Sequence, residues 1–143
     1  MEEFSIEQRY RRFLLAVAGF IFIGTILELI LLEHFQETLQ FTPFILSGVG
    51  LLAVIAVWVA PNRLSLLTLR WVMAAVALGS LFGMYQHFSG NLAFVMEINP
   101  TFTTTEALLP AIKGSFPLLA PGILLVAGIL GIAATYQHPE LER

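Results

Sequence analysis

Residues 13–32 read FLLAVAGFIFIGTILELILL, and this stretch decides the class of the protein. Glu28 is its one ionisable residue. A helix needs about 20 predominantly apolar residues to cross the ~30 Å hydrocarbon core of a bilayer. The stretch therefore predicts a transmembrane helix.

Three further apolar stretches follow, from about Pro43 to Ala60, from Trp71 to Tyr85 and from Pro117 to Tyr136. The whole chain of 143 residues is 57% hydrophobic and 12% charged, with a mean hydropathy of +0.83. Soluble domains carry about 25% charged residues. Because lipid cannot satisfy exposed backbone groups, the crossing segments must be helices.

We therefore predict an all-α integral membrane protein, a four-transmembrane-helix bundle that forms a single membrane domain over residues 1–143. The expected helices occupy about residues 11–34, 42–60, 67–88 and 117–137. Thr42 is expected to cap the second helix ahead of Pro43. Pro61 and Asn62 are expected to end that helix.

The basic residues are distributed unevenly along the chain. Six of the seven fall on one predicted side of the membrane, and only Lys113 falls on the other; the six are Arg9, Arg11, Arg12, Arg63, Arg70 and Arg143. Lysine- and arginine-rich loops remain in the cytoplasm. Both termini and the 61–70 loop are thus expected inside, and the long 89–116 connection outside.

The 89–116 connection is too apolar for a free loop. Residues 91–98 are compatible with a short strand or hairpin, and Asn99-Pro100 is a turn signal. Thr103 followed by Glu106 fits a capping box, which favours a short helix over 107–113. We expect this segment to form a lid over the outer face of the bundle.

Small residues mark positions where helix backbones are expected to approach closely. The candidate positions are Ser47, Gly48 and Gly50 in the second predicted helix, Gly79, Ser80 and Gly83 in the third, and Gly128 and Gly131 in the fourth.

Glu28 and His87 are the most informative polar residues of the apolar stretches. Glu28 lies 16 residues beyond Arg12, and His87 lies 17 residues beyond Arg70. At 1.5 Å per residue, these separations are ~24 Å and ~25.5 Å. Glu28 and His87 therefore fall at nearly equal depth, if the two arginines mark the inner boundary. A carboxylate in hydrocarbon costs about 3 kcal/mol and needs a partner, so the first and third helices are expected to touch at a Glu28–His87 pair.

The outer end of the bundle carries further side chains of the same kind, and together they form a predicted outer polar cluster: Glu28, Glu33, His34, His87 and Glu97. Three hypotheses remain open for it. In the first, the pair is purely structural. In the second, Glu28, His34 and His87 hold a divalent metal such as zinc, iron or manganese, or one histidine ligates a haem. In the third, the pair relays protons or lines a transport path.

The composition limits the range of functions. The chain has no cysteine, which excludes disulfides and thiolate metal sites made by this chain alone. Its net charge of −3 and scattered basic residues give no support to nucleic-acid binding. No nucleophile elbow or phosphate-binding loop is recognisable, so an enzyme is not favoured.

The pattern is typical of small bacterial inner-membrane proteins. The first hypothesis for function is a non-enzymatic accessory or scaffolding component that contacts the lipid bilayer, a second copy of itself or a larger membrane complex. The alternative is a metal- or haem-binding redox or transport protein that uses the outer polar cluster. The sequence does not distinguish between the two.

Overall fold

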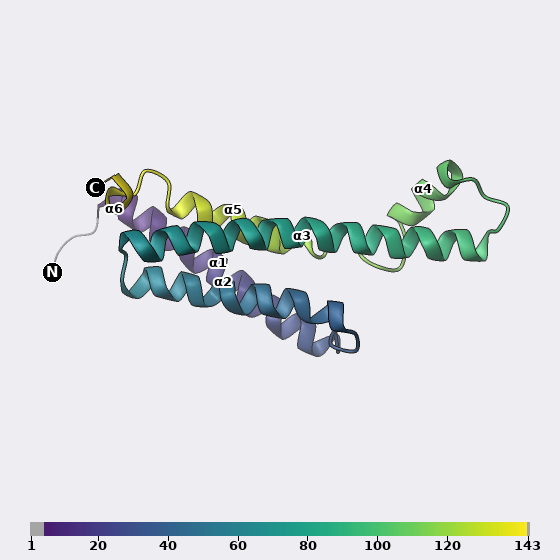
Figure 1. Cartoon of the computed structure of the whole chain (residues 1–143), viewed down its shortest axis with the longest axis horizontal. Coiled ribbons are helices and arrows are strands. Elements are labelled where there is room, and N and C mark those ends of the chain that lie inside the picture. Colours follow the sequence, from purple (N-terminus) through teal and green to yellow (C-terminus); the bar gives the residue numbers. More distant parts are fainter. Residues whose placement is uncertain (1–4, 143) are drawn as a thin grey trace.

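A computed structural model describes residues 5–142, which are helical along most of their length (Figure 1). Its elements are α1 (Ile6–Leu31), η1 (Thr38–Phe41), α2 (Thr42–Val59), α3 (Arg63–Ile98), α4 (Thr104–Ile112), α5 (Gly122–Ala134) and α6 (Pro139–Glu142). The described residues contain no strand, which confirms the all-α class. The strand considered within 91–98 is wrong, because these residues continue α3 without a break.

Within residues 5–142 four long helices form the bundle, and the start of α1 and the short α6 lie at the same end of the molecule (Figure 1). α1 packs against α2 and α5, and α3 packs against the same two helices. α1 and α3 are therefore diagonal neighbours. The expectation that these two helices touch at Glu28 and His87 is wrong, because α2 and α5 lie between them.

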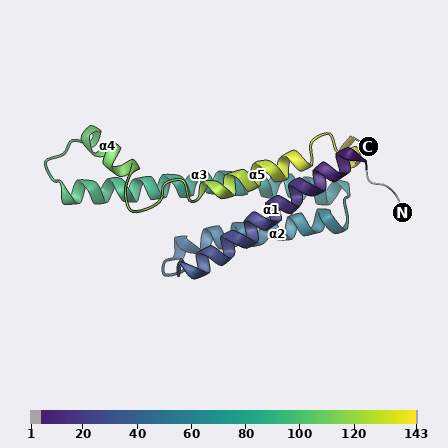
Figure 2. The same ribbon diagram turned by 180° about the vertical axis from the view of Figure 1, so that it is seen from behind.

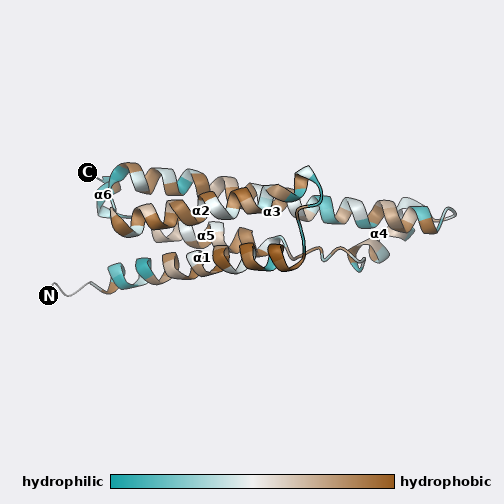
Figure 3. Ribbon diagram, turned by 90° about the horizontal axis from the view of Figure 1, so that it is seen from below, coloured by the Kyte–Doolittle hydropathy of each residue, from teal (hydrophilic) through white to brown (hydrophobic). Residues whose placement is uncertain are grey.

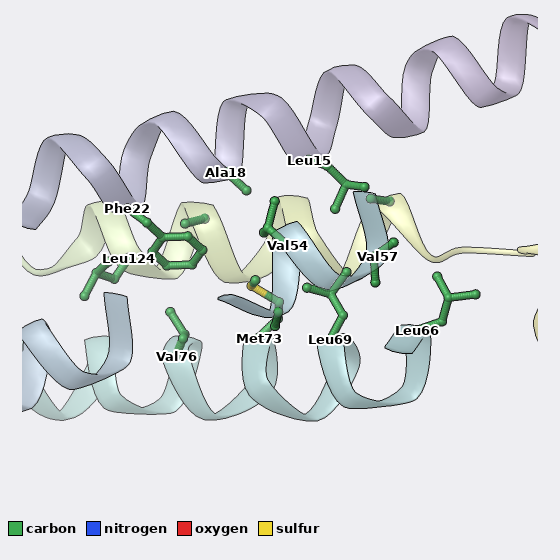
Figure 4. Packing of buried hydrophobic residues seen from close by; sticks show 13 residues of the cluster. Leu15, Ala18, Phe22, Val54, Val57, Leu66, Leu69, Met73, Val76 and Leu124 are labelled. Atoms are coloured by element: carbon green, nitrogen blue, oxygen red, sulfur yellow. The ribbon is translucent and has the colours of Figure 1, made fainter. Parts of the chain in front are cut away.

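The core lies on the inward faces of these four helices (Figure 4). Phe22 of α1 is fully buried, and so are Leu69, Met73 and Val76 of α3. Phe22 fills the space left by Gly50, where an added Cβ would approach the phenyl ring to 2.5 Å. Gly128 lets α5 approach the backbone of α3, since a Cβ there would lie 2.8 Å from the Met73 carbonyl oxygen.

The outward faces of the helices are apolar as well, which is unusual for a protein surface in water. Phe20 and Trp71 are each 76% exposed, and Leu78 is 68% exposed. Figure 3 shows hydrophobic residues along the bundle helices, with hydrophilic ones at the start of α1 and in the α1–α2 connection. Three helical segments are long and apolar enough to cross a membrane, namely Ile6–Leu31, Thr38–Val59 and Arg63–Ile98. α5 is equally apolar but has only 13 residues.

Most helix ends follow their local sequence, but the fourth helix, predicted over about residues 117–137, is shorter and comprises Gly122–Ala134. The Thr103–Glu106 capping box begins α4 as predicted, and α2 ends at Val59, with Ala60 as its C-cap just before Pro61. Asn62 caps the start of α3 by accepting a hydrogen bond from the Ser65 backbone. Thr42 does not cap α2, because it is already the first residue of that helix and Phe41 holds the cap position.

The small residues that were predicted to mark close helix approaches have different surroundings in the structure. Gly79 and Gly83 receive Leu46 and the ring of Pro121, and Gly131 receives Met73. Gly48 has open space around it, so it makes no close approach within the chain.

The 89–116 segment does not form a lid over the bundle. The 36 residues of α3 make a helix ~54 Å long, far more than one crossing requires. Its last turns project beyond the other bundle helices on the side remote from α6, and α4 folds back on them (Figures 1 and 2). We call this projecting hairpin, residues 92–112, the arm. Residues 113–121, which return from the arm to α5, are called the strap.

Candidate functional site

Each member of the predicted outer polar cluster occupies a different environment. Glu28 lies on α1 and is exposed, and its side chain has no hydrogen-bond or ion-pair partner within residues 5–142. His87 lies half-buried on α3. Glu97 lies near the tip of the arm, ten residues and about 15 Å along the helix from His87. The structure therefore does not bring Glu28, His87 and Glu97 together.

Glu33 and His34 lie in the turn that ends α1. Glu33 has a φ of 51°, a left-handed conformation more usual for glycine at this position after a helix. His34 is half-buried and lies within electrostatic range of His87. Burial lowers the pKa of His34 below its ordinary value, and the neighbouring positive charge of His87 lowers it further. Of the predicted cluster, only the two histidines are shown to influence each other.

His87 forms its hydrogen bond with the strap and not with Glu28. Its Nδ1 lies 2.9 Å from the Pro117 carbonyl oxygen, and its ring lies 6.2 Å from the Phe116 ring, centre to centre. Because a carbonyl oxygen only accepts hydrogen bonds, Nδ1 is the donor and carries the proton.

Asn91 holds the next residue of the strap through both ends of its amide. Its Nδ2 donates to the Phe116 carbonyl at 2.8 Å, and its Oδ1 accepts from the Phe116 backbone N–H at 2.9 Å. Asn91 is only 2% exposed. Gly114 lies so close to this amide that any side chain there would collide with it. The paired bonds fix one orientation of the amide, since a flipped amide would break both.

Ser80 performs the same task where the strap enters α5. Its hydroxyl donates to the Pro121 carbonyl at 2.6 Å and accepts from the Leu125 N–H at 3.1 Å. The Leu125 amide would otherwise be an unsatisfied donor in the first turn of a helix. Ser80 is 1% exposed, so no water competes for these groups.

Ser80, His87 and Asn91 form one row on α3, which we call the polar ladder. Their separations of seven and four residues place all three on one face of the helix. The ladder satisfies backbone groups of the non-helical strap, as buried backbone groups without a helical partner require. The polar ladder contains no charge pair, so a search for charged partners does not find it. The sequence signal for the ladder is a stripe of small and polar residues in an otherwise apolar helix.

Arginines hold the opposite end of α5. Arg70 donates from Nε to the Thr135 hydroxyl at 2.7 Å and from a terminal nitrogen to the Thr135 carbonyl at 2.9 Å. Arg11 donates to the carbonyls of Tyr136 and Gln137 at 3.2 and 3.0 Å. These side chains supply donors to the carbonyls at the end of the helix, where the helix dipole favours positive charge. Sequence reasoning treated both arginines only as topology signals.

One buried polar group has no partner. Ser47 of α2 is fully buried, and its hydroxyl makes no hydrogen bond within the described residues. Thr25 of α1 is also buried. Both lie one turn outward of the Phe22–Gly50 contact, because α1 and α2 are antiparallel.

The metal hypothesis gains no support from the geometry. No group of three or more histidine and carboxylate side chains within residues 5–142 lies close enough to share a metal ion. Comparison with protein-family models, curated proteins and solved structures finds no match for this chain. The arrangement of its own residues is therefore the basis for any statement about function.

Proposed function

We propose that the chain is a non-enzymatic accessory or scaffolding component of a bacterial inner membrane, with four crossings and both termini in the cytoplasm. The start of α1 and the short α6 lie at the same end of the bundle, which supports an even number of crossings (Figure 1). The fourth crossing would comprise α5 together with the turns of the strap that precede it. The basic residues on the side of the termini support the orientation.

The observation that carries the accessory role is the arm. It projects past the bundle and is braced at its base by both hydrogen bonds of Asn91. The contact between the two helices of the arm buries only small side chains, those of Val95, Ala107 and Ala111. Large apolar side chains remain exposed on it, among them Phe94, Ile98 and Leu109 at 51%, 58% and 61%. A rigid projection with exposed apolar side chains suits a protein that contacts other proteins.

Topology can be mapped cleanly because the natural chain has no cysteine. Single cysteines at Gln36 and Thr101 should react with a membrane-impermeant maleimide added from outside intact cells. Cysteines at Leu64 and Glu142 should react only after the membrane is opened. Labelling of Glu142→Cys from outside would contradict the four-crossing topology.

The accessory role is tested by removing the arm from the full chain. Two glycines in place of residues 95–111 should leave membrane insertion and thermal stability of the bundle intact. In native gels of mildly solubilised host membranes, the parent chain should migrate as a particle larger than the sum of its own mass of 15.8 kDa and the bound detergent. The shortened chain should migrate at the size expected for that sum. Stoichiometric metal or a Soret band in the purified parent protein would contradict the proposal.

A further inference from the structure

We propose that the outer half of α1 is a docking face for a single membrane helix of another protein, one that carries a lysine or arginine side chain in the outer leaflet. This inference rests on the proposed function as a membrane accessory component and names the chemistry of its partner. The anchor on this chain is Glu28.

Glu28 belongs to a stripe of α1 that is covered in its inner part and bare in its outer part. Leu14, Ile21 and Glu28 are seven residues apart, so they lie on one face of the helix. Leu14 and Ile21 are half-buried and pack against the core cluster. Glu28 continues the stripe but is exposed.

The helix that covers the inner part of this stripe is α5. Gly19 marks the side of α1 that faces α2, since it lies against Val54 and Leu51. Leu14 is about 140° away from Gly19 around the helix at 100° per residue. α1 has α5 as its other main neighbour, so the stripe of Leu14 and Ile21 faces α5.

α5 begins too late to reach Glu28. Phe22 of α1 and Leu124 of α5 belong to one layer of the core (Figure 4). Glu28 lies six residues outward of Phe22, about 9 Å, whereas Gly122 begins α5 two residues outward of Leu124, about 3 Å. The carboxylate thus stands about 6 Å beyond the start of α5. In Figure 2, α1 and α5 diverge in this direction.

The surroundings of Glu28 are apolar and open. Leu27 is 56% exposed and Leu31 is 82% exposed, and Gly24, one turn further inward than Glu28, has no atom near its missing side chain. A neighbouring helix could therefore approach α1 closely at Gly24. Glu28 lies within a segment long and apolar enough to cross a membrane. There a carboxylate normally pairs with a cationic side chain, and residues 5–142 supply none.

Charge complementarity selects the occupant. The basic residues of α1 and α3 lie at the opposite end of the bundle, and Lys113 lies at the end of α4. A second copy of the chain would thus place carboxylate against carboxylate at this level. A helix from another protein with one lysine or arginine at the level of Glu28 satisfies both the charge and the open apolar surface.

The test uses the full-length protein in lipid nanodiscs and a synthetic single-span peptide as the probe. The peptide is a leucine–alanine helix with one lysine four residues inside its outer end, and a matched peptide has leucine at that position. Energy transfer between labelled protein and labelled peptide measures association. We expect the lysine peptide to bind at least tenfold more tightly than the leucine peptide.

Two variants locate the effect. Glu28→Gln should remove the preference for the lysine peptide, and Glu28→Lys should transfer the preference to a peptide with glutamate at the same position. Glu33→Gln, which lies beyond the end of α1, is the matched control and should keep the preference. Circular dichroism of each variant verifies that the helices are intact.

Equal binding of the lysine and leucine peptides by the parent protein would overturn the proposal. So would self-association of the parent that Glu28→Gln abolishes, because a second copy would then occupy the face. Neither result bears on topology or on the native particle, so failure here is distinguishable from failure of the proposed function.

Discussion

Replacement of Asn91 by leucine should release the strap while leaving the bundle folded. Leucine has nearly the same volume but no hydrogen-bonding group. The change leaves the Phe116 N–H and carbonyl without the partners they have at 2.9 and 2.8 Å. Each buried backbone group left unsatisfied costs about 1–3 kcal/mol, so we expect a local loss of about 2–6 kcal/mol for the two groups.

Hydrogen exchange followed by mass spectrometry measures this loss at the strap. A tenfold change in an equilibrium constant corresponds to about 1.4 kcal/mol, so amides in residues 113–120 should exchange faster by a factor of roughly thirty to twenty thousand. Amides of α1 and α2 should be unaffected. Asn99→Leu is the matched control, because Asn99 Nδ2 bonds only to Val95 of its own helix. Unchanged exchange in the strap, or an equal increase throughout the bundle, would refute the role assigned to the ladder.

Three further predictions concern packing, an unpaired hydroxyl and pH. Gly128→Ala should destabilise the protein by about 1–3 kcal/mol in thermal unfolding because the new methyl group meets the α3 backbone, whereas Gly48→Ala, in open space, should not. Ser47→Ala should raise the midpoint of thermal unfolding, since it removes a buried hydroxyl that has no partner; a lower midpoint would contradict this assignment. The folded state lowers the pKa values of His34 and His138, so unfolded chains bind more protons below the ordinary value of 6.5. Stability should therefore fall as pH drops below about 6.5 in denaturation curves, and a double replacement of both histidines by glutamine should flatten the dependence.

Sequence patterns predicted the helical class and most local features because these depend on neighbouring residues. The capping box at Thr103 and Glu106 and the end of α2 before Pro61 are examples, since a capping side chain or a missing N–H acts within one turn. The apolar stretches likewise predicted helices suited to a membrane. The extent of α3 was missed because Asn91 to Ile98 combines residues that tolerate either strand or helix. In the structure this segment is helical and packs against α4, where Ala107 and Ala111 are buried.

The site was less accessible to sequence reasoning because it depends on which helices are neighbours. The depth of Glu28 and His87 was estimated from the rise per residue along a helix. This rise gives the position along the helix axis but not which neighbouring helix a side chain faces. α1 and α3 turned out to be diagonal, so two groups at one level do not meet. The actual partners of His87 and Asn91 are backbone atoms of Pro117 and Phe116, and backbone groups leave no signature in residue identity.

The arrangement at the end of α5 also bears on how the chain enters the bilayer. On the proposed topology, Arg11 and Arg70 act through charge alone during insertion, since the end of α5 has yet to be synthesised. Once that end exists, the same guanidinium groups bond to the Thr135 hydroxyl and to the carbonyls of residues 135–137, which follow the last turn. Lysine at these positions would preserve the charge that orients the nascent chain, but it lacks the planar fork that reaches two acceptors at once. Such variants should insert correctly and yet have a frayed C-terminal end. They would therefore distinguish the role of these two residues in insertion from their role in the packing of the folded protein.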